Sequence, residues 1–258
     1  MSTSETTGAH SRATPSAEAG ERRPVFVTTH WSVVLTAGRS DTTRARAALD
    51  QLCRNYWHLL YAYVRRAGHS REEAQDLTQE FFARLLARNT VARADPARGR
   101  FRSFLLASLK HFLANEWDRV RAQKRGGSAR FLTLDFDTAE TRCVQPVAPG
   151  DTPDRAFDRQ WALALLDVVL GRARKEYADS GRDELFLGLK DTLTGGRSEI
   201  PYRELAARLG LSEGAVKVAA HRLRRRYREL LREEIASTVA GPEEVEEELK
   251  HLFAALSP

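Results

Sequence analysis

The chain has little cysteine and no long apolar run. Of its 258 residues only Cys53 and Cys143 are cysteines, and they lie far apart with no secretory segment before them, which argues against a disulfide framework. No apolar stretch approaches the roughly 20 residues that a membrane-spanning helix needs. We therefore expect a cytoplasmic protein that makes no contact with a membrane.

The sequence also lacks the spacings typical of catalytic and metal sites. Its seven histidines are scattered, and it has no HExxH, no metal-spaced Cys/His group, no phosphate-binding glycine loop and no carboxylate cluster in a basic setting. We therefore expect no enzyme, no metal and no cofactor.

Alternating strand patterns are scarce, and Ala, Leu, Arg and Glu dominate, which predicts an all-α fold. We expect two small helical domains joined by a flexible linker, followed by a short C-terminal helix. A proline-broken stretch between two helical regions marks the linker. The expected boundaries are a disordered tail at 1–23, a first domain at 24–125, a linker at 126–154, a second domain at 155–235 and an amphipathic extension at 236–258.

Charge is distributed in blocks along the chain. Residues 98–130 carry nine Lys/Arg against two acidic residues, and residues 202–232 carry nine against three. Residues 131–160 reverse this balance, and the tail from Glu233 is strongly acidic. Two basic blocks around an acidic connector indicate two contacts with one polyanion.

The most informative segment runs from Pro201 to Ile235. Pro201 suits a first helical position, Gly210 can end that helix in the left-handed conformation, and Leu211 is expected to fill the corner. Ser212 is a good N-cap for a second, basic helix with one apolar stripe. This pattern predicts a helix-turn-helix, with a surface helical hairpin as the simpler alternative.

Other local signals mark the ends of helices. Thr28 or Thr29 is expected to cap a first helix, and Ser70 with Glu73 forms a capping box. One long helix is expected from Phe101 to about Arg125, and helical pattern returns over Arg155–Ala178 and 183–193. Past Gly241 a short helix places Val245, Leu249, Leu252, Phe253 and Leu256 on one face.

Three segments resemble the sigma-70 family of bacterial RNA polymerase specificity factors, in particular its compact extracytoplasmic-function (ECF) group. DLTQEFFARLL, beginning at Asp76, resembles the core-binding motif of region 2. FRSFLLASLKHFLANEWDRVRAQKR resembles the promoter-melting segment, and YRELAARLGLSEGAVKVAAHRLRR resembles region 4. The resemblance covers about two thirds of the chain, with the motifs in the family's order.

The resemblance implies partners and residues for each segment. Core RNA polymerase and promoter DNA are the implied partners, and an anti-sigma protein is a further partner that such factors can have. The residues implied to form or brace the polymerase-docking surface are Asp76, Leu77, Gln79, Glu80 and Phe82.

In the melting segment the family usually has Asn where this chain has His111, and Asp or Asn at Asn115. The resemblance implies that this pair helps hold a base flipped out of the −10 element, with His111 stacking on a base or donating one hydrogen bond; a half-buried helix histidine is the alternative. Trp117 is expected to pack, with base stacking as its alternative. The candidate phosphate contacts are Arg119, Arg121, Lys124 and Arg125.

In region 4 the residues that match the family's −35 readers are Lys217, Val218, His221 and Arg222. Lys217 and Arg222 can reach the O6 and N7 atoms of guanine. The family commonly has a small polar residue and then Arg where this chain has Val218 and Ala219, which favours contact with a thymine methyl. The candidate phosphate contacts on the same helix are Arg224, Arg225 and Arg228.

These assignments imply a non-enzymatic initiation factor that binds core polymerase, directs it to −35 and −10 elements and stabilises the melted strand. The alternative is a helix-turn-helix regulator with a helical sensor domain, which leaves DLTQEFF unexplained. For the C-terminal extension we expect docking on the chain's own helical domains, ahead of binding a partner or lengthening the last domain's core.

Overall fold

The computed structural model describes residues 30–39, 42–87, 89–122, 152–194 and 200–257, and for 118–122 and 194 it describes the backbone only. Within these ranges every regular element is helical, which confirms the all-α fold class. The expected N-terminal tail and nearly all of the expected linker lie outside the described residues.

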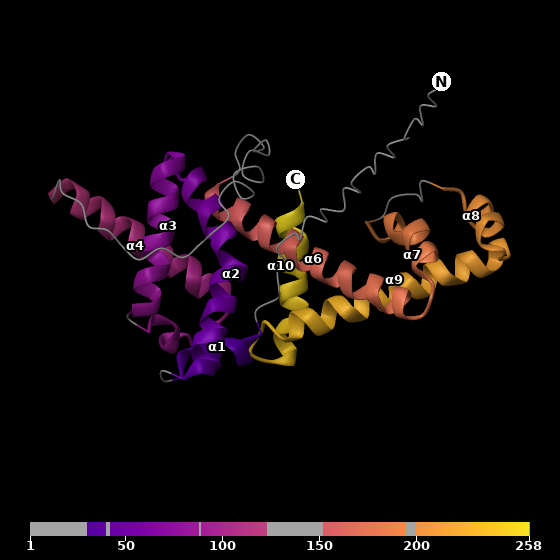
Figure 1. Cartoon of the computed structure of the whole chain (residues 1–258), viewed down its shortest axis with the longest axis horizontal. Coiled ribbons are helices and arrows are strands. Elements are labelled where there is room, and N and C mark those ends of the chain that lie inside the picture. Colours follow the sequence, from indigo (N-terminus) through magenta and orange to yellow (C-terminus); the bar gives the residue numbers. More distant parts are fainter. Residues whose placement is uncertain (1–29, 40–41, 88, 123–151, 195–199, 258) are drawn as a thin grey trace, which may run out of the picture.

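The first half of the chain forms a helical unit around α2. Its elements are α1 (Trp31–Gly38), α2 (Thr43–Arg66), α3 (Arg71–Ala87), the 3-10 turns η1 (Thr90–Arg93) and η2 (Pro96–Arg98), and α4 (Phe101–Ala122). Helix α2 is buried along most of its length and packs against α1 and α3 (Figure 1). Aromatic rings of Tyr56, Phe101 and Trp31 meet edge to face at its base.

Local capping explains where these helices begin. Thr42 Oγ1 accepts a hydrogen bond from the backbone N–H of Ala45 and starts α2. The expected capping box is confirmed, because Ser70 Oγ accepts from the N–H of Glu73 while the Glu73 carboxylate accepts from the N–H of Ser70. The expected cap on the first helix is wrong: the N-cap of α1 is His30, which makes no side-chain capping bond.

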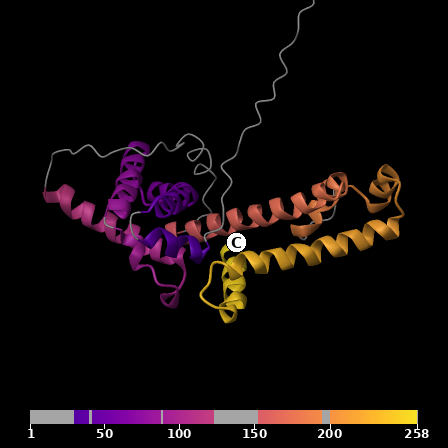
Figure 2. The same cartoon turned by 60° about the horizontal axis from the view of Figure 1, so that its bottom comes forward.

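The second half forms an extended unit built on two long antiparallel helices. It contains α6 (Pro153–Asp179), α7 (Asp183–Leu189), η3 (Lys190–Thr194), α8 (Tyr202–Leu209) and α9 (Glu213–Ala236). Helices α6 and α9 lie side by side, with α7 and α8 at their far end (Figure 2). Buried residues recur every four positions along α6 at Phe157, Trp161, Leu165, Val169 and Ala173, which gives one face against α9 and α2.

The two helices and the tight turn expected between Pro201 and Ile235 are present as α8 and α9. Gly210 adopts the left-handed conformation at φ 63° and ends α8, and Ser212 Oγ accepts from the N–H of Ala215 to start α9. Two details differ. Pro201 is the N-cap of α8 rather than its first residue, and Leu211 is 43% exposed, so it does not fill the corner.

The chain ends in η4 (Pro242–Glu244) and α10 (Val245–Leu256). Helix α10 packs on both α6 and α9 and lies between the two halves of the molecule (Figure 1). This packing fits both the expected docking on the chain's own domains and the alternative, in which the extension lengthens the core of the last domain. The expected apolar face is partly wrong, because Leu249 and Leu252 are buried whereas Phe253 is 58% exposed.

Candidate nucleic-acid and polymerase interfaces

The exposed side of α9 carries most of the residues expected to read the −35 element. Val216, Ala220 and Leu223 are buried and fix which side of the helix faces inward. The exposed candidates are Lys217, Val218, His221, Arg222, Arg225 and Arg228. They extend over more than three turns of a helix that follows a tight turn, which is the arrangement that enters a major groove.

Two of these cations are held by acids on the same helix. Lys217 Nζ lies 2.7 Å from Glu213 Oε1, and Arg225 Nε lies 3.0 Å from Glu229 Oε1. The hydrogen bond from Lys217 holds the pKa of Glu213 below its ordinary value. Because both pairs are largely exposed, they contribute little to stability and are readily exchanged for a contact with DNA.

Arg224 differs from its neighbours on α9. It is half-buried, and its guanidinium donates to the carbonyl oxygen of Thr192 at 3.2 Å and to the hydroxyl of Tyr202 at 3.3 Å. These bonds join α9 to η3 and α8. The structure therefore gives Arg224 a role in positioning the helix-turn-helix.

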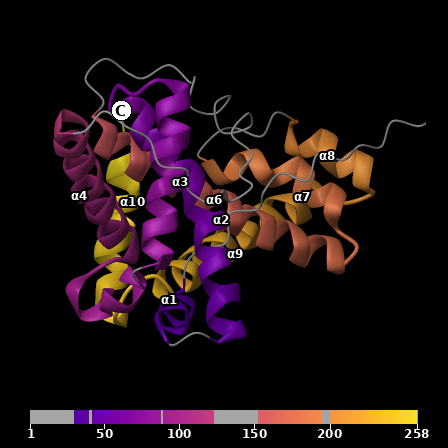
Figure 3. The same cartoon turned by 60° about the vertical axis from the view of Figure 1, so that its left-hand side comes forward.

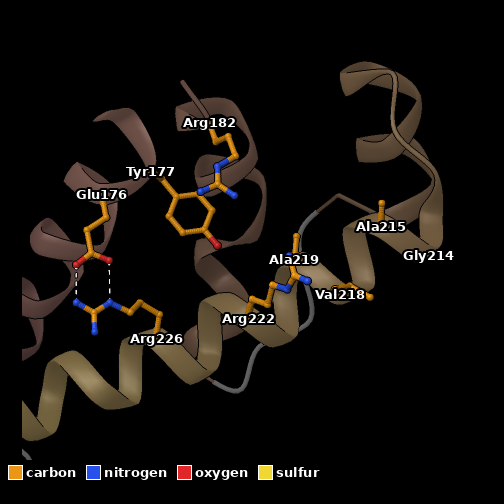
Figure 4. Close-up of a pocket in the computed structure, with 9 residues that line it drawn as sticks. All are labelled: Glu176, Tyr177, Arg182, Gly214, Ala215, Val218, Ala219, Arg222 and Arg226. Atoms are coloured by element: carbon orange, nitrogen blue, oxygen red, sulfur yellow. Dashed lines mark hydrogen bonds and ion pairs between the residues drawn. The ribbon is translucent and has the colours of Figure 1, made fainter. Parts of the chain in front are cut away.

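A cavity of about 570 Å³ lies beside α9, between it and the corner where α6 turns into α7 (Figure 4). Val218 and Arg222 line it from α9, while Tyr177 and Arg182 line it from the other side. The Arg182 guanidinium lies 5.1 Å from the centre of the Tyr177 ring. Val218 and Arg222 therefore lie next to basic and aromatic side chains that sequence reasoning did not single out.

Glu176 and Arg226 close one end of this cavity. Two guanidinium nitrogens of Arg226 donate to the two carboxylate oxygens of Glu176 at 2.9 and 2.7 Å. The same pairing lowers the pKa of Glu176 and raises that of Arg226. This bidentate contact joins the end of α6 to the middle of α9 and fixes the spacing of the two helices.

The candidates for the −10 contact lie on α4. His111 and Asn115 are both exposed and one turn apart, so they share one side of the helix, and His111 is not the half-buried histidine of the alternative. Arg119 and Arg121 belong to the last turns of α4, of which only the backbone is described, and Lys124 and Arg125 lie outside the described residues. Trp117 is 60% exposed, so the expected packing is wrong.

The candidates for polymerase docking lie on α3 and have unequal exposure. Asp76 is exposed, whereas Leu77, Gln79 and Glu80 are half-buried. Phe82 is 1% exposed and lies against Phe81, so it braces the helix from inside. The outer side of α3 is therefore polar, as the sequence indicates.

Arg84 links this surface to α4. Its guanidinium lies 2.7 Å from Glu80 Oε1 and 2.6 Å from Glu116 Oε1, and it stacks over the Phe112 ring at 5.0 Å. The candidate docking surface and the candidate melting helix are thus joined through one side chain. Sequence reasoning missed Arg84, because nothing local indicates that its second carboxylate comes from another helix.

The described ranges hold no group of His, Cys, Asp and Glu side chains able to bind a metal ion. No helix among the described residues has the length and apolar content to cross a membrane.

Comparison with protein families gives one match. Residues 52–125 match the family model described as Sigma-70 region 2, a span that runs from α2 to just beyond α4. No curated protein and no solved structure matches the chain. The matched span contains both the polar surface of α3 and the exposed His111 and Asn115 on α4. Residues 52–125 of this chain are therefore similar to region 2 of sigma-70 proteins.

Proposed function

We propose that this chain is a cytoplasmic ECF-type sigma factor that binds core RNA polymerase, directs it to −35 and −10 elements and assists promoter melting. One observation carries the proposal: a region 2 match over residues 52–125 is followed, in the same chain, by a helix-turn-helix whose exposed side is basic. Two DNA-binding units in one small all-α chain suit a protein that contacts two separated promoter elements.

In this proposal α3 docks on polymerase. Asp76, Gln79 and Glu80 offer a polar, mainly acidic surface, which suits a basic partner helix. Leu77 and Phe82 hold that surface in place from the side of the core. Arg84 ties Glu80 to α4, so docking at α3 positions the helix that contacts the −10 strand.

Helix α4 then holds the melted strand. The Asn115 carboxamide pairs with a base edge, and His111, one turn earlier, stacks on a base or donates one hydrogen bond. The candidate phosphate contacts beyond this pair are Arg119, Arg121, Lys124 and Arg125, whose contribution is sequence-independent and sensitive to salt. Trp117, exposed on the same helix, offers a surface on which an unpaired base stacks.

Helix α9 reads the −35 element. Lys217 and Arg222 recognise guanine, and a good bidentate pair discriminates by about 1–3 kcal/mol. Val218 contacts a thymine methyl, His221 lies between the two readers, and Arg225 and Arg228 bind phosphates. Arg224, also a candidate phosphate contact, acts through its bonds to Thr192 and Tyr202 as a positioning residue.

The proposed domain boundaries follow from these roles. Residues 24–125 form the polymerase and −10 unit, and residues 155–235 form the −35 unit. The acidic linker at 126–154 occupies a basic polymerase channel before transcript fills it, and 236–258 is the amphipathic extension. An anti-sigma protein is a further proposed partner.

Association with core polymerase tests the proposal against the helix-turn-helix regulator. Tagged chain is mixed with core enzyme, and the complex is isolated at moderate ionic strength. We expect a stoichiometric complex that Asp76→Arg weakens at least tenfold. Glu184→Arg makes the same charge change at an exposed site on α7 and serves as the control. A chain that binds duplex DNA but never core polymerase is the regulator instead.

A further inference from the structure

Helix α10 contacts both halves of the molecule. It packs on α6 and α9, and Arg232 on α9 lies 2.8 Å from Glu246. Its third contact is with the start of α4, more than a hundred residues earlier in the chain (Figure 3). The end of the chain therefore connects the region 2 unit with the helix-turn-helix unit.

The contact with α4 is made by one fully buried acid, Glu248. Its side chain has no exposed surface, and its carboxylate oxygen Oε2 lies 2.5 Å from Arg100 Nε. The other oxygen accepts a hydrogen bond from Arg102. Burying a carboxylate costs free energy unless the carboxylate is paired. The pairing of Glu248 with Arg100 and Arg102 therefore holds α10 in this position.

The two arginines are held by more than Glu248. The Arg102 guanidinium is 5% exposed and lies 3.8 Å from the centre of the Trp161 ring on α6, with Asp158 at 3.6 Å. A small cavity of about 160 Å³ adjoins the cluster and is lined in part by Ser103 and His251. Arg100 and Arg102 thus line a preformed binding site, which α10 does not fill completely. We call it the arginine site.

The arginine site has the chemistry of a phosphate-binding site. An arginine fork recognises a carboxylate and a phosphate in the same planar, bidentate way. Arg100 and Arg102 flank the first residue of α4, the helix that also carries His111 and Asn115. Both arginines belong to the first basic block of the chain, yet here Glu248, close to the C-terminal end of the chain, pairs with both of them.

We propose that α10 is an intramolecular latch. In the free protein its Glu248 occupies the arginine site, and in the promoter complex DNA backbone phosphates bind there instead. Release of α10 frees Arg100 and Arg102 for phosphate and removes one of the contacts between the two units, which α2 and α6 also join. The identity of the displacing anion as promoter DNA rests on the proposed function. The latch itself does not.

The test compares Glu248→Gln with Glu247→Gln in the full chain. Both variants remove one negative charge from α10, but Glu247 is exposed. Binding to a fluorescein-labelled duplex is measured over a salt series. We expect Glu248→Gln to bind at least threefold more tightly than Glu247→Gln. Both variants contact the same phosphates once DNA is bound, so their plots of log K against log[salt] should have equal slopes. Small-angle scattering without DNA should show a larger radius of gyration for Glu248→Gln alone.

Equal affinities and equal radii for the two variants overturn the proposal. Should Glu248→Gln fail to unfold cooperatively, amide hydrogen exchange of residues 245–256 is measured in the native chain with and without saturating duplex. Faster exchange with DNA supports release of α10, and unchanged protection contradicts it. No polymerase is present in these experiments, so failure to bind core enzyme leaves their outcome unaffected.

Discussion

Arg224 on α9 donates a hydrogen bond to the carbonyl oxygen of Thr192 in η3 at 3.2 Å, although its place in the basic stripe marks it as a phosphate contact. The bond fixes the approach of η3 and α8 to α9. A residue chosen from the sequence for DNA binding thus supports the element that carries the other candidate DNA-binding residues.

This relationship separates the expected effects of two arginine variants. Arg224→Ala should lower the free energy of unfolding by about 1 kcal/mol, because it removes hydrogen bonds made by a charged donor at a half-buried site. Arg228→Ala should change the free energy of unfolding by less than about 0.5 kcal/mol. It should instead reduce the slope of log K against log[salt] for DNA binding by the amount that one phosphate contact contributes. Urea unfolding and DNA titration measure the two quantities, and identical profiles for both variants would contradict the assignment.

Lys217→Ala should relax base preference in the −35 element. Loss of a bidentate contact to guanine costs about 1–3 kcal/mol of discrimination at one position. Its pair with Glu213 is exposed, so folding stability should not change measurably. Selection of bound duplexes from a randomised pool checks this. Arg228→Ala, expected to weaken all sequences alike, is the control.

Gly188→Ala should destabilise the packing of α7 on α8. A Cβ at this position would lie 2.5 Å from Leu205 Cδ1, and Leu205 is 1% exposed, so the core must shift. Overpacking of this kind costs about 1–3 kcal/mol. At Gly171 on α6 a Cβ meets nothing within 4 Å, and Gly171→Ala should stabilise the helix by up to about 1 kcal/mol. Thermal unfolding of both variants tests this contrast. Equal shifts in the melting temperature of the two variants would contradict it.

Cys53 should react very slowly with thiol reagents in the native protein. Burial raises the pKa of its thiol to about 12, so at neutral pH the reactive thiolate is almost absent. Because the pKa is raised, the slow labelling rate should keep rising with pH through pH 8–9, where the rate of an exposed cysteine levels off. Labelling in a Cys143→Ala background measures Cys53 alone, and urea should accelerate it sharply. Rapid native labelling would show that the core around α2 opens.

Local signals predicted much of this fold. Ser212 caps α9, Gly210 ends α8, and Ser70 with Glu73 starts α3, because each depends on hydrogen bonds within a few residues. The apolar stripes also oriented α9 correctly, so the exposed candidate residues could be selected from periodicity. Boundaries differed by a residue or two where caps were ambiguous, as at His30 and Pro201.

Contacts between distant segments could not be predicted in this way. The second carboxylate of Arg84 comes from α4, and the partners of Glu248 lie at the start of that helix. One signal for Glu248 was present: it falls three residues after Val245 and four before Leu252, inside the apolar stripe. Exposure of Trp117 and Phe253 was mispredicted because helical spacing alone does not say which helices lie alongside.

Run-off transcription tests the central proposal most directly. Core RNA polymerase is supplied with a promoter library, with and without this chain. We predict transcripts that start at defined promoters only when the chain is present. Their shared −10 and −35 bases should change in His111 and Lys217 variants. Transcription no different from that of core enzyme alone, under conditions where the chain is folded, would contradict its assignment as a sigma factor.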